Sequence, residues 1–159
     1  MTTHQKLGKL KRIPFTKEGY DKLVKKLKGL QESRPAAVKE LARARELGDL
    51  TENGLYTAAK ARLNSIDNQI FRAEMTMKLA DVVESKNSNV VSIGSRVTVS
   101  DGVSEVEYKI VGDTETNPKE NKISQHSPIG LALIRKSAGD SIKIQTPSGI
   151  KTLRIRLIK

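Results

Sequence analysis

Two stretches of heptad-spaced apolar residues, separated by a short reversal, constrain the fold of this 159-residue chain more than any other feature. In the first, apolar side chains recur in alternating steps of three and four residues, and Arg34 is the polar exception. The second shows the same alternation without a break. Such spacing is typical of helices that pack side by side in a coiled coil. The seam positions are 20, 23, 27, 30, 34, 37, 41 and 44, followed by 56, 59, 63, 66, 70, 73, 77 and 80.

The residues around these seams predict an antiparallel helical hairpin. Thr16 is suited to cap the first helix, and Gly48 suits the left-handed position after its end. A connection as short as this one forces the two helices to run antiparallel. Pro35 should bend the first helix locally, and Arg34 should snorkel or form an ion pair. From Thr16 to Leu47 the hairpin would extend nearly 50 Å, at about 1.5 Å per residue.

Beyond the helical pattern, which runs to Val83, the hydrophobic period changes to two. Ser127 and Pro128 are a cap and a first helical residue, so they predict a short helix through residue 134. The fold class is therefore α+β, with a long N-terminal antiparallel coiled-coil hairpin followed by an antiparallel β domain that contains a short helix. Predicted strands occupy 96–100, 106–111, 141–145 and 150–158; the predicted domains are 1–85, a linker at 86–92, and 93–159.

Composition narrows the classes of function. A net charge of +11 and a pI near 9.9 point to a polyanionic partner, and five scattered aromatic residues are too few for a base-stacking platform. The chain contains no cysteine, which excludes disulfides and thiolate zinc sites. His4 and His126 are interpreted as surface residues. No apolar run approaches the roughly 20 residues of a membrane span, so we expect a cytoplasmic protein with no membrane partner.

The tip segment, residues 46–59, is acidic within this basic chain: it holds Glu46, Asp49 and Glu52 and no Lys or Arg. Asp49 and Glu52 permit two interpretations. Their spacing before a helix fits a capping box, in which both side chains satisfy free backbone N–H groups. Two carboxylates also suit a magnesium ion that takes its remaining ligands from water and phosphate.

Motifs in both halves resemble, in order, those of the bacterial Gre-type transcript cleavage factors. The resemblance covers about residues 13 to 158. In the first half it rests on Arg34-Pro35, Ala44-Arg45, Gly48-Asp49-Leu50-Thr51-Glu52-Asn53, Tyr56 and Ala58-Ala59-Lys60. In the second half it rests on Ile110-Val111-Gly112, Ile123-Ser124, Ser127-Pro128-Ile129, Ala132-Leu133-Ile134, Gly139-Asp140 and Thr146-Pro147-Ser148-Gly149.

This resemblance implies a monomeric transcription elongation factor that binds RNA polymerase and is not an enzyme alone. A C-terminal FKBP-like domain would dock at the polymerase secondary channel through Ser127 and Pro128, and the coiled coil would enter the channel. Asp49 and Glu52 would help to hold Mg²⁺ and position water in the polymerase active site, which then hydrolyses backtracked RNA. Arg45 and Lys60 match a basic patch that contacts nascent RNA; the alternative for both is an ordinary solvated helix surface.

One departure from the family pattern leaves other functions open. The family tip usually continues Asn-Ala-acid-Tyr, whereas this chain has Asn53-Gly54-Leu55-Tyr56 and lacks the third acid. The alternative function is a regulator that occupies the secondary channel without promoting cleavage. A weaker alternative is a basic coiled coil that binds nucleic acid independently of polymerase. We reject prolyl isomerase activity, because Tyr108 is the sole aromatic residue after position 86.

Overall fold

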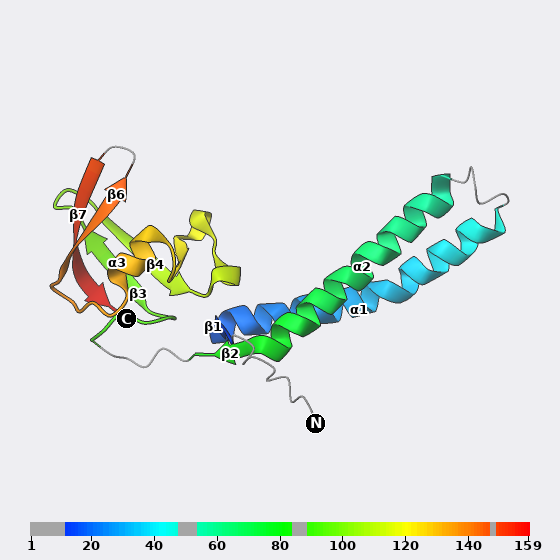
Figure 1. Cartoon of the computed structure of the whole chain (residues 1–159), viewed down its shortest axis with the longest axis horizontal. Helices are drawn as coiled ribbons and strands as arrows, with labels where there is room; N and C mark the ends of the chain where they lie inside the picture. The colour runs from blue at the N-terminus through cyan, green and yellow to red at the C-terminus, as the bar shows by residue number, and fades with distance from the viewer. Residues whose placement is uncertain (1–11, 48–53, 84–88, 147–148) are drawn as a thin grey trace, which may run out of the picture. The chain divides into compact units, whose positions relative to one another are not determined.

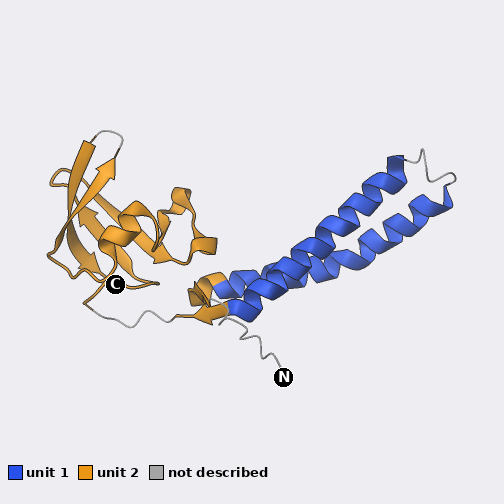
Figure 2. Cartoon of the chain, in the orientation of Figure 1, with its two compact units in different colours: residues 1–10, 20–79 blue, residues 11–19, 80–159 orange. Residues whose placement is uncertain are grey.

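The computed structural model describes residues 12–47, 54–83, 89–146 and 149–159, which belong to two compact units (Figures 1 and 2). Unit 1 contains the described residues of Tyr20–Leu79, and unit 2 combines residues up to Gly19 with Ala80–Lys159. The division falls inside helix α1 (Lys17–Glu46). Unit 2 is therefore assembled from two stretches that are separated in the sequence by most of the helical hairpin.

The hairpin, called the arm below, consists of α1, α2 (Gly54–Leu79) and the residues that connect them. At about 1.5 Å per residue the two helices are about 45 and 39 Å long. They lie side by side in opposite directions (Figure 1). Ion pairs between the helices fix this direction, because Arg34 contacts Asp67 at 2.7 Å whereas Glu40, further along α1, contacts the earlier residue Arg62 at 2.7 Å. The predicted antiparallel hairpin is confirmed.

The predicted seams coincide with the buried side of each helix. Their buried members in the arm are Ala37, Ala44, Ala59, Ile66 and Ala73. Arg34 occupies a seam position but is exposed and paired with Asp67, as expected for a charged residue at that place. Helix α1 continues through Pro35.

The start of α1 is capped as predicted. The Gly19 backbone N–H donates to Oγ1 of Thr16 at 3.0 Å, which satisfies one of the N–H groups left free in the first turn.

The helical prediction extended too far at the other end of the arm. Helix α2 ends at Leu79, and Ala80–Val82 form strand β2, which pairs in parallel with β1 (Ile13–Phe15). Neither strand was predicted. Each has only three residues, too few to show a period of two, and the apolar residues of β2 continue the helical spacing of α2.

Unit 2 also contains a five-stranded sheet in the order β5-β4-β3-β7-β6. Every neighbouring pair is antiparallel except β4 and β5, so the predicted antiparallel β domain contains one parallel pair. The strands are β3 (Arg96–Ser100), β4 (Glu105–Val111), β5 (Lys122–Ser124), β6 (Ser141–Thr146) and β7 (Gly149–Ile158). Two 3-10 turns, η1 (Asp113–Glu115) and η2 (Pro118–Glu120), connect β4 to β5.

The sheet curls around one hydrophobic core. Helix α3 (Pro128–Leu133) contacts both edge strands, β5 and β6, and a flat sheet of five strands would hold these edges about 19 Å apart. Val91 is 1% exposed in this core, so the globular structure begins inside the predicted linker; residues 86–88 lie outside the described residues. The core residues are Val91, Val97, Val99, Ile110, Leu133, Ile142, Ile144, Leu153 and Ile155.

Candidate functional site

The first candidate site is the free end of the arm. Gly48, Asp49 and Glu52 lie outside the described residues, so their predicted roles remain predictions. The described residues on either side are exposed and apolar: Leu47 is 68% exposed and Leu55 is 65% exposed. The tip segment therefore presents two exposed leucines, one on each side of the residues that include Asp49 and Glu52 in the sequence.

Tyr56 brings the two predicted RNA-binding residues together. The guanidinium carbon of Arg45 lies 5.8 Å from the centroid of the Tyr56 ring, and Nζ of Lys60 lies 5.9 Å from it. Both distances are within the range in which a cation is attracted to an aromatic face. Tyr56 was predicted as a seam residue and belongs to the family motif of the tip, but no contact with Arg45 or Lys60 was predicted for it. The four-residue spacing to Lys60 was a local signal for half of this arrangement, but the contact with Arg45 requires the second helix.

The second candidate site is the start of α3, where Ser127 and Pro128 were predicted to dock on a partner. Ser127 Oγ accepts the Gly130 backbone N–H at 3.0 Å and donates to the Ser124 carbonyl at 2.7 Å. Its hydroxyl is therefore the N-cap of α3. Pro128, the first helical residue, is exposed. Of this predicted pair, Pro128 is exposed and accessible to a partner, whereas the Ser127 side chain stabilises the first turn of α3.

A small polar cluster adjoins this helix start. His126 Nδ1 lies 3.0 Å from both carboxylate oxygens of Asp113, and the Ser124 hydroxyl donates to the same carboxylate. The His126 backbone N–H donates to the Ser124 hydroxyl at 2.9 Å. His126 is exposed, as predicted, but it also ties the α3 start to η1, which no sequence pattern indicated.

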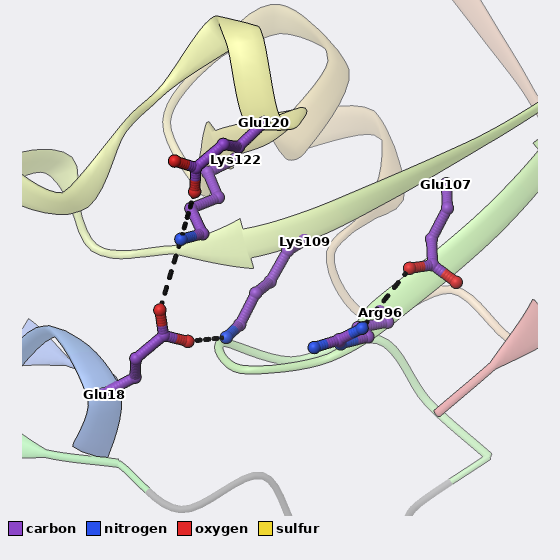
Figure 3. Close-up of a pocket in the computed structure, with 6 residues that line it drawn as sticks. All are labelled: Glu18, Arg96, Glu107, Lys109, Glu120 and Lys122. Atoms are coloured by element: carbon purple, nitrogen blue, oxygen red, sulfur yellow. Dashed lines mark hydrogen bonds and ion pairs between the residues drawn. The ribbon is translucent and has the colours of Figure 1, made fainter.

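A charged depression of about 240 Å³ occupies another part of unit 2 (Figure 3). Glu18 lies between two lysines, 2.5 Å from Lys109 Nζ and 3.2 Å from Lys122 Nζ. Hydrogen bonds to Glu120 and then Glu18 raise the pKa of Lys122 above its usual value. Arg96 and Glu107 pair at 3.7 Å on the same wall. Because three cations face three carboxylates here, the depression has no surplus charge with which to attract an anion.

Within 12–47, 54–83, 89–146 and 149–159, no group of three or more His, Asp or Glu side chains is placed to hold a metal ion. None of the helices in these ranges is long and apolar enough to cross a membrane.

Comparison with known proteins decides the family. A transcription elongation factor GreA of Macrococcus caseolyticus is 39% identical over 153 residues, which cover 94% of this chain and 96% of that protein. A GreA of Pelobacter propionicus is 43% identical over 152 residues, which cover 92% of this chain and 96% of that protein. The chain belongs to the GreA/GreB family of transcription elongation factors. The resemblance inferred from the sequence is confirmed.

The two GreA/GreB family models divide the chain near the end of the arm. The model for the N-terminal part of these transcription elongation factors matches residues 13–82, and the GreA/GreB C-terminal model matches residues 85–159. Among solved structures, the crystal structure of Gfh1, GreA factor homolog 1 of Thermus thermophilus, matches with 28% sequence identity. The match covers 94% of this chain and 99% of the Gfh1 chain, with a TM-score of 0.45. In this GreA/GreB chain the N-terminal match thus contains the arm, and the C-terminal match contains the curled sheet and α3.

Proposed function

We propose that this GreA/GreB-family elongation factor stimulates the cleavage of backtracked RNA by RNA polymerase. The observation that carries the proposal is the convergence of Arg45 and Lys60, from different helices, on Tyr56 at the end of the arm. The two cations flank, in the sequence, the segment that contains Asp49 and Glu52. A phosphate of the extruded RNA can bind the cations while the acids face the reacting bond.

The acids are proposed to act together with a metal that belongs to the polymerase. Mg²⁺ prefers hard oxygen ligands and often takes only one or two carboxylates, so a pair of acids can complete a site that it does not build alone. Asp49 and Glu52 supply such a pair. When bound, the metal stabilises charge at the phosphate and lowers the pKa of a bound water.

Docking is proposed to occur through unit 2. Pro128 is exposed at the start of α3, and the Ser127 cap holds the backbone that presents it. Binding through a surface distant in sequence from the tip leaves Asp49 and Glu52 available to the polymerase active site. We propose that the protein acts as a monomer, with one arm for one secondary channel.

The test uses purified backtracked elongation complexes. Wild-type protein is expected to release short 3′ RNA fragments, and the Asp49→Asn, Glu52→Gln double variant is expected to release them about 10- to 100-fold more slowly. Glu46→Gln is the matched control, because it removes an acid of the tip segment outside the proposed pair. Polymerase affinity is measured in parallel by competition. Normal cleavage by the double variant, with binding retained, would refute the proposed role of the acids.

A second function is favoured by Leu55, which is 65% exposed where the family pattern has an acid. With that acid absent, the arm would occupy the secondary channel and block nucleotide entry without promoting cleavage. Wild-type protein that binds polymerase and slows RNA synthesis, but releases no RNA fragment, would support this second function over the first.

A further inference from the structure

The ring of Tyr56 contacts both Arg45 and Lys60, so it can fix the positions of these two side chains at the end of the arm. Tyr56 opens the seam of α2 and is half-buried there, whereas Arg45 and Lys60 are exposed. Partial burial fixes the ring before any ligand arrives. The long side chains of Arg45 and Lys60 would otherwise sample many rotamers, and a fixed aromatic face reduces this freedom.

Three other cations of the arm form ion pairs with carboxylates. Arg34 contacts Asp67 at 2.7 Å, Arg62 contacts Glu40 at 2.7 Å, and Lys28 contacts Glu32 at 3.9 Å. Each of these pairs compensates the positive charge with a carboxylate. Within the described residues of the arm, Arg45 and Lys60 have no such ion pair, which is also true of Arg43 and Arg72; Arg45 and Lys60 are distinguished by their contact with the Tyr56 ring. A neutral ring attracts a cation without cancelling its charge, so both cations retain full attraction for an anion.

We propose that Tyr56 is a positioning residue that holds Arg45 and Lys60 as one binding site for a phosphate of single-stranded RNA. This inference rests on the proposed function and adds the residue that makes two side chains, 15 positions apart in the sequence, act together. Neither helix could build the site alone, because Arg45 lies in the last turn of α1 and Lys60 lies in the second turn of α2. Tyr56 itself need not contact the RNA.

The test compares two substitutions of the ring. Tyr56→Phe keeps the aromatic face and removes the hydroxyl, and Tyr56→Leu keeps an apolar seam residue and removes the face. The measured quantity is the ratio of dissociation constants for elongation complexes with and without backtracked RNA. Wild-type protein should prefer backtracked complexes. Tyr56→Leu should reduce that preference about fivefold, close to the effect of Arg45→Ala, and Tyr56→Phe should keep it within about twofold.

The controls separate this role from a structural one. Tyr56→Leu should leave the affinity for complexes without backtracked RNA unchanged, because that affinity reports docking through unit 2. It should add little to the loss caused by the Arg45→Ala, Lys60→Ala double variant, because its effect passes through those two cations. An unchanged preference in Tyr56→Leu would overturn the proposal, as would an equal loss in Tyr56→Phe or a parallel loss of both affinities.

The same experiment distinguishes failure of this inference from failure of the proposed function. If wild-type protein releases no RNA fragment yet prefers backtracked complexes in a Tyr56-dependent way, the cleavage function fails and the positioning role stands. If wild-type protein cleaves and Tyr56→Leu keeps the full preference, only the positioning role fails. A wild-type protein without any preference for backtracked complexes refutes the positioning role directly.

Discussion

Thr16 and Glu115, 99 residues apart in the sequence, form a paired hydrogen bond within unit 2. The Thr16 backbone N–H donates to Oε1 of Glu115 at 2.8 Å, and the Thr16 hydroxyl donates to Oε2. Thr16 is 5% exposed and also caps α1 through the Gly19 N–H. One carboxylate therefore satisfies two donors that water reaches poorly.

Removing that carboxylate should destabilise unit 2. In Glu115→Ala the two Thr16 donors lose their acceptor, and we expect the free energy of unfolding to fall by about 1–3 kcal/mol. Urea unfolding followed by circular dichroism measures the change. Glu105→Ala is the matched control: Glu105 pairs with Arg156 at 3.6 Å on an exposed surface, so its loss should cost less than about 0.5 kcal/mol. Equal losses in the two variants would contradict this prediction.

Substituting alanine at two glycines should change the stability of the protein in opposite directions. A Cβ on Gly112 would lie 2.1 Å from the Pro14 carbonyl oxygen, so Gly112→Ala must displace backbone and should cost about 1–3 kcal/mol. A Cβ on Gly29, inside α1, would meet nothing within 4 Å. Gly29→Ala should therefore stabilise the arm by about 1 kcal/mol through helix propensity. Thermal unfolding of both variants, beside wild type, tests the pair; a stabilised Gly112→Ala would show that Pro14 approaches less closely.

The Asp101 turn should contribute stability that depends on pH. The Lys151 side chain, followed by the Ser104 and Val103 backbone N–H groups, holds the pKa of Asp101 well below its usual value. A carboxyl with a depressed folded-state pKa stabilises the fold above its unfolded pKa, which is about 3.9, and loses this contribution as the pH falls further. Asp101→Asn should therefore be less stable than wild type at pH 7, and the difference should shrink below about pH 4. A difference independent of pH would exclude the charge as its cause.

Substitutions of Ser127 and Pro128 should distinguish an effect on folding stability from an effect on polymerase docking. Ser127→Ala removes the α3 cap and should lower the free energy of unfolding by about 1 kcal/mol. Pro128→Ala keeps the cap and should change stability by less than about 0.5 kcal/mol, but under the docking proposal it weakens polymerase binding. Pro118, which follows the Asn117 cap of η2, gives the control. Pro118→Ala alters an equivalent exposed position outside the docking site and should bind normally.

Leu55→Glu restores the acid that the family pattern places in the tip and should strengthen magnesium-dependent cleavage. One added negative charge acting on a divalent ion at a separation on the order of 8 Å through water contributes about 1 kcal/mol, or about fivefold in the magnesium concentration for half-maximal cleavage. Leu47→Glu is the matched control, since Leu47 is similarly exposed and lies on the other side of Asp49 and Glu52 in the sequence. Equal gains in both variants would indicate a general effect of charge rather than a position-specific one.

The sequence was most informative where a period repeats. Seven steps of three and four residues in each seam were enough to predict both helices of the arm and their pairing. Alternation predicted β3, β4, β6 and β7 to within a residue at most of their ends. Strands β1, β2 and β5 have three residues each and are stabilised by their partners, so no local pattern could reveal them.

In the candidate site, too, some features were predictable from the sequence and others depend on contacts between distant parts of the chain. Resemblance to a family identified Arg45, Lys60, Ser127 and Pro128, but not how the chain uses them. The Ser127 cap was predicted from the sequence and is confirmed, whereas the contact of Tyr56 with both cations is made only in the folded structure. The links from Glu18 to Lys109 and Lys122 span 91 and 104 positions, a separation at which no spacing rule applies.

The parallel pairing of β1 with β2 has a consequence for the order of folding. Residues 13–15 leave the ribosome long before 80–82, yet neither stretch can pair without the other. Closing so long a loop in a disordered chain is entropically costly and slow. An antiparallel helical hairpin forms from local contacts and returns the chain to its starting point. Because the arm connects residues 13–15 to residues 80–82 through two antiparallel helices, the β1–β2 ladder does not have to close a loop of disordered chain.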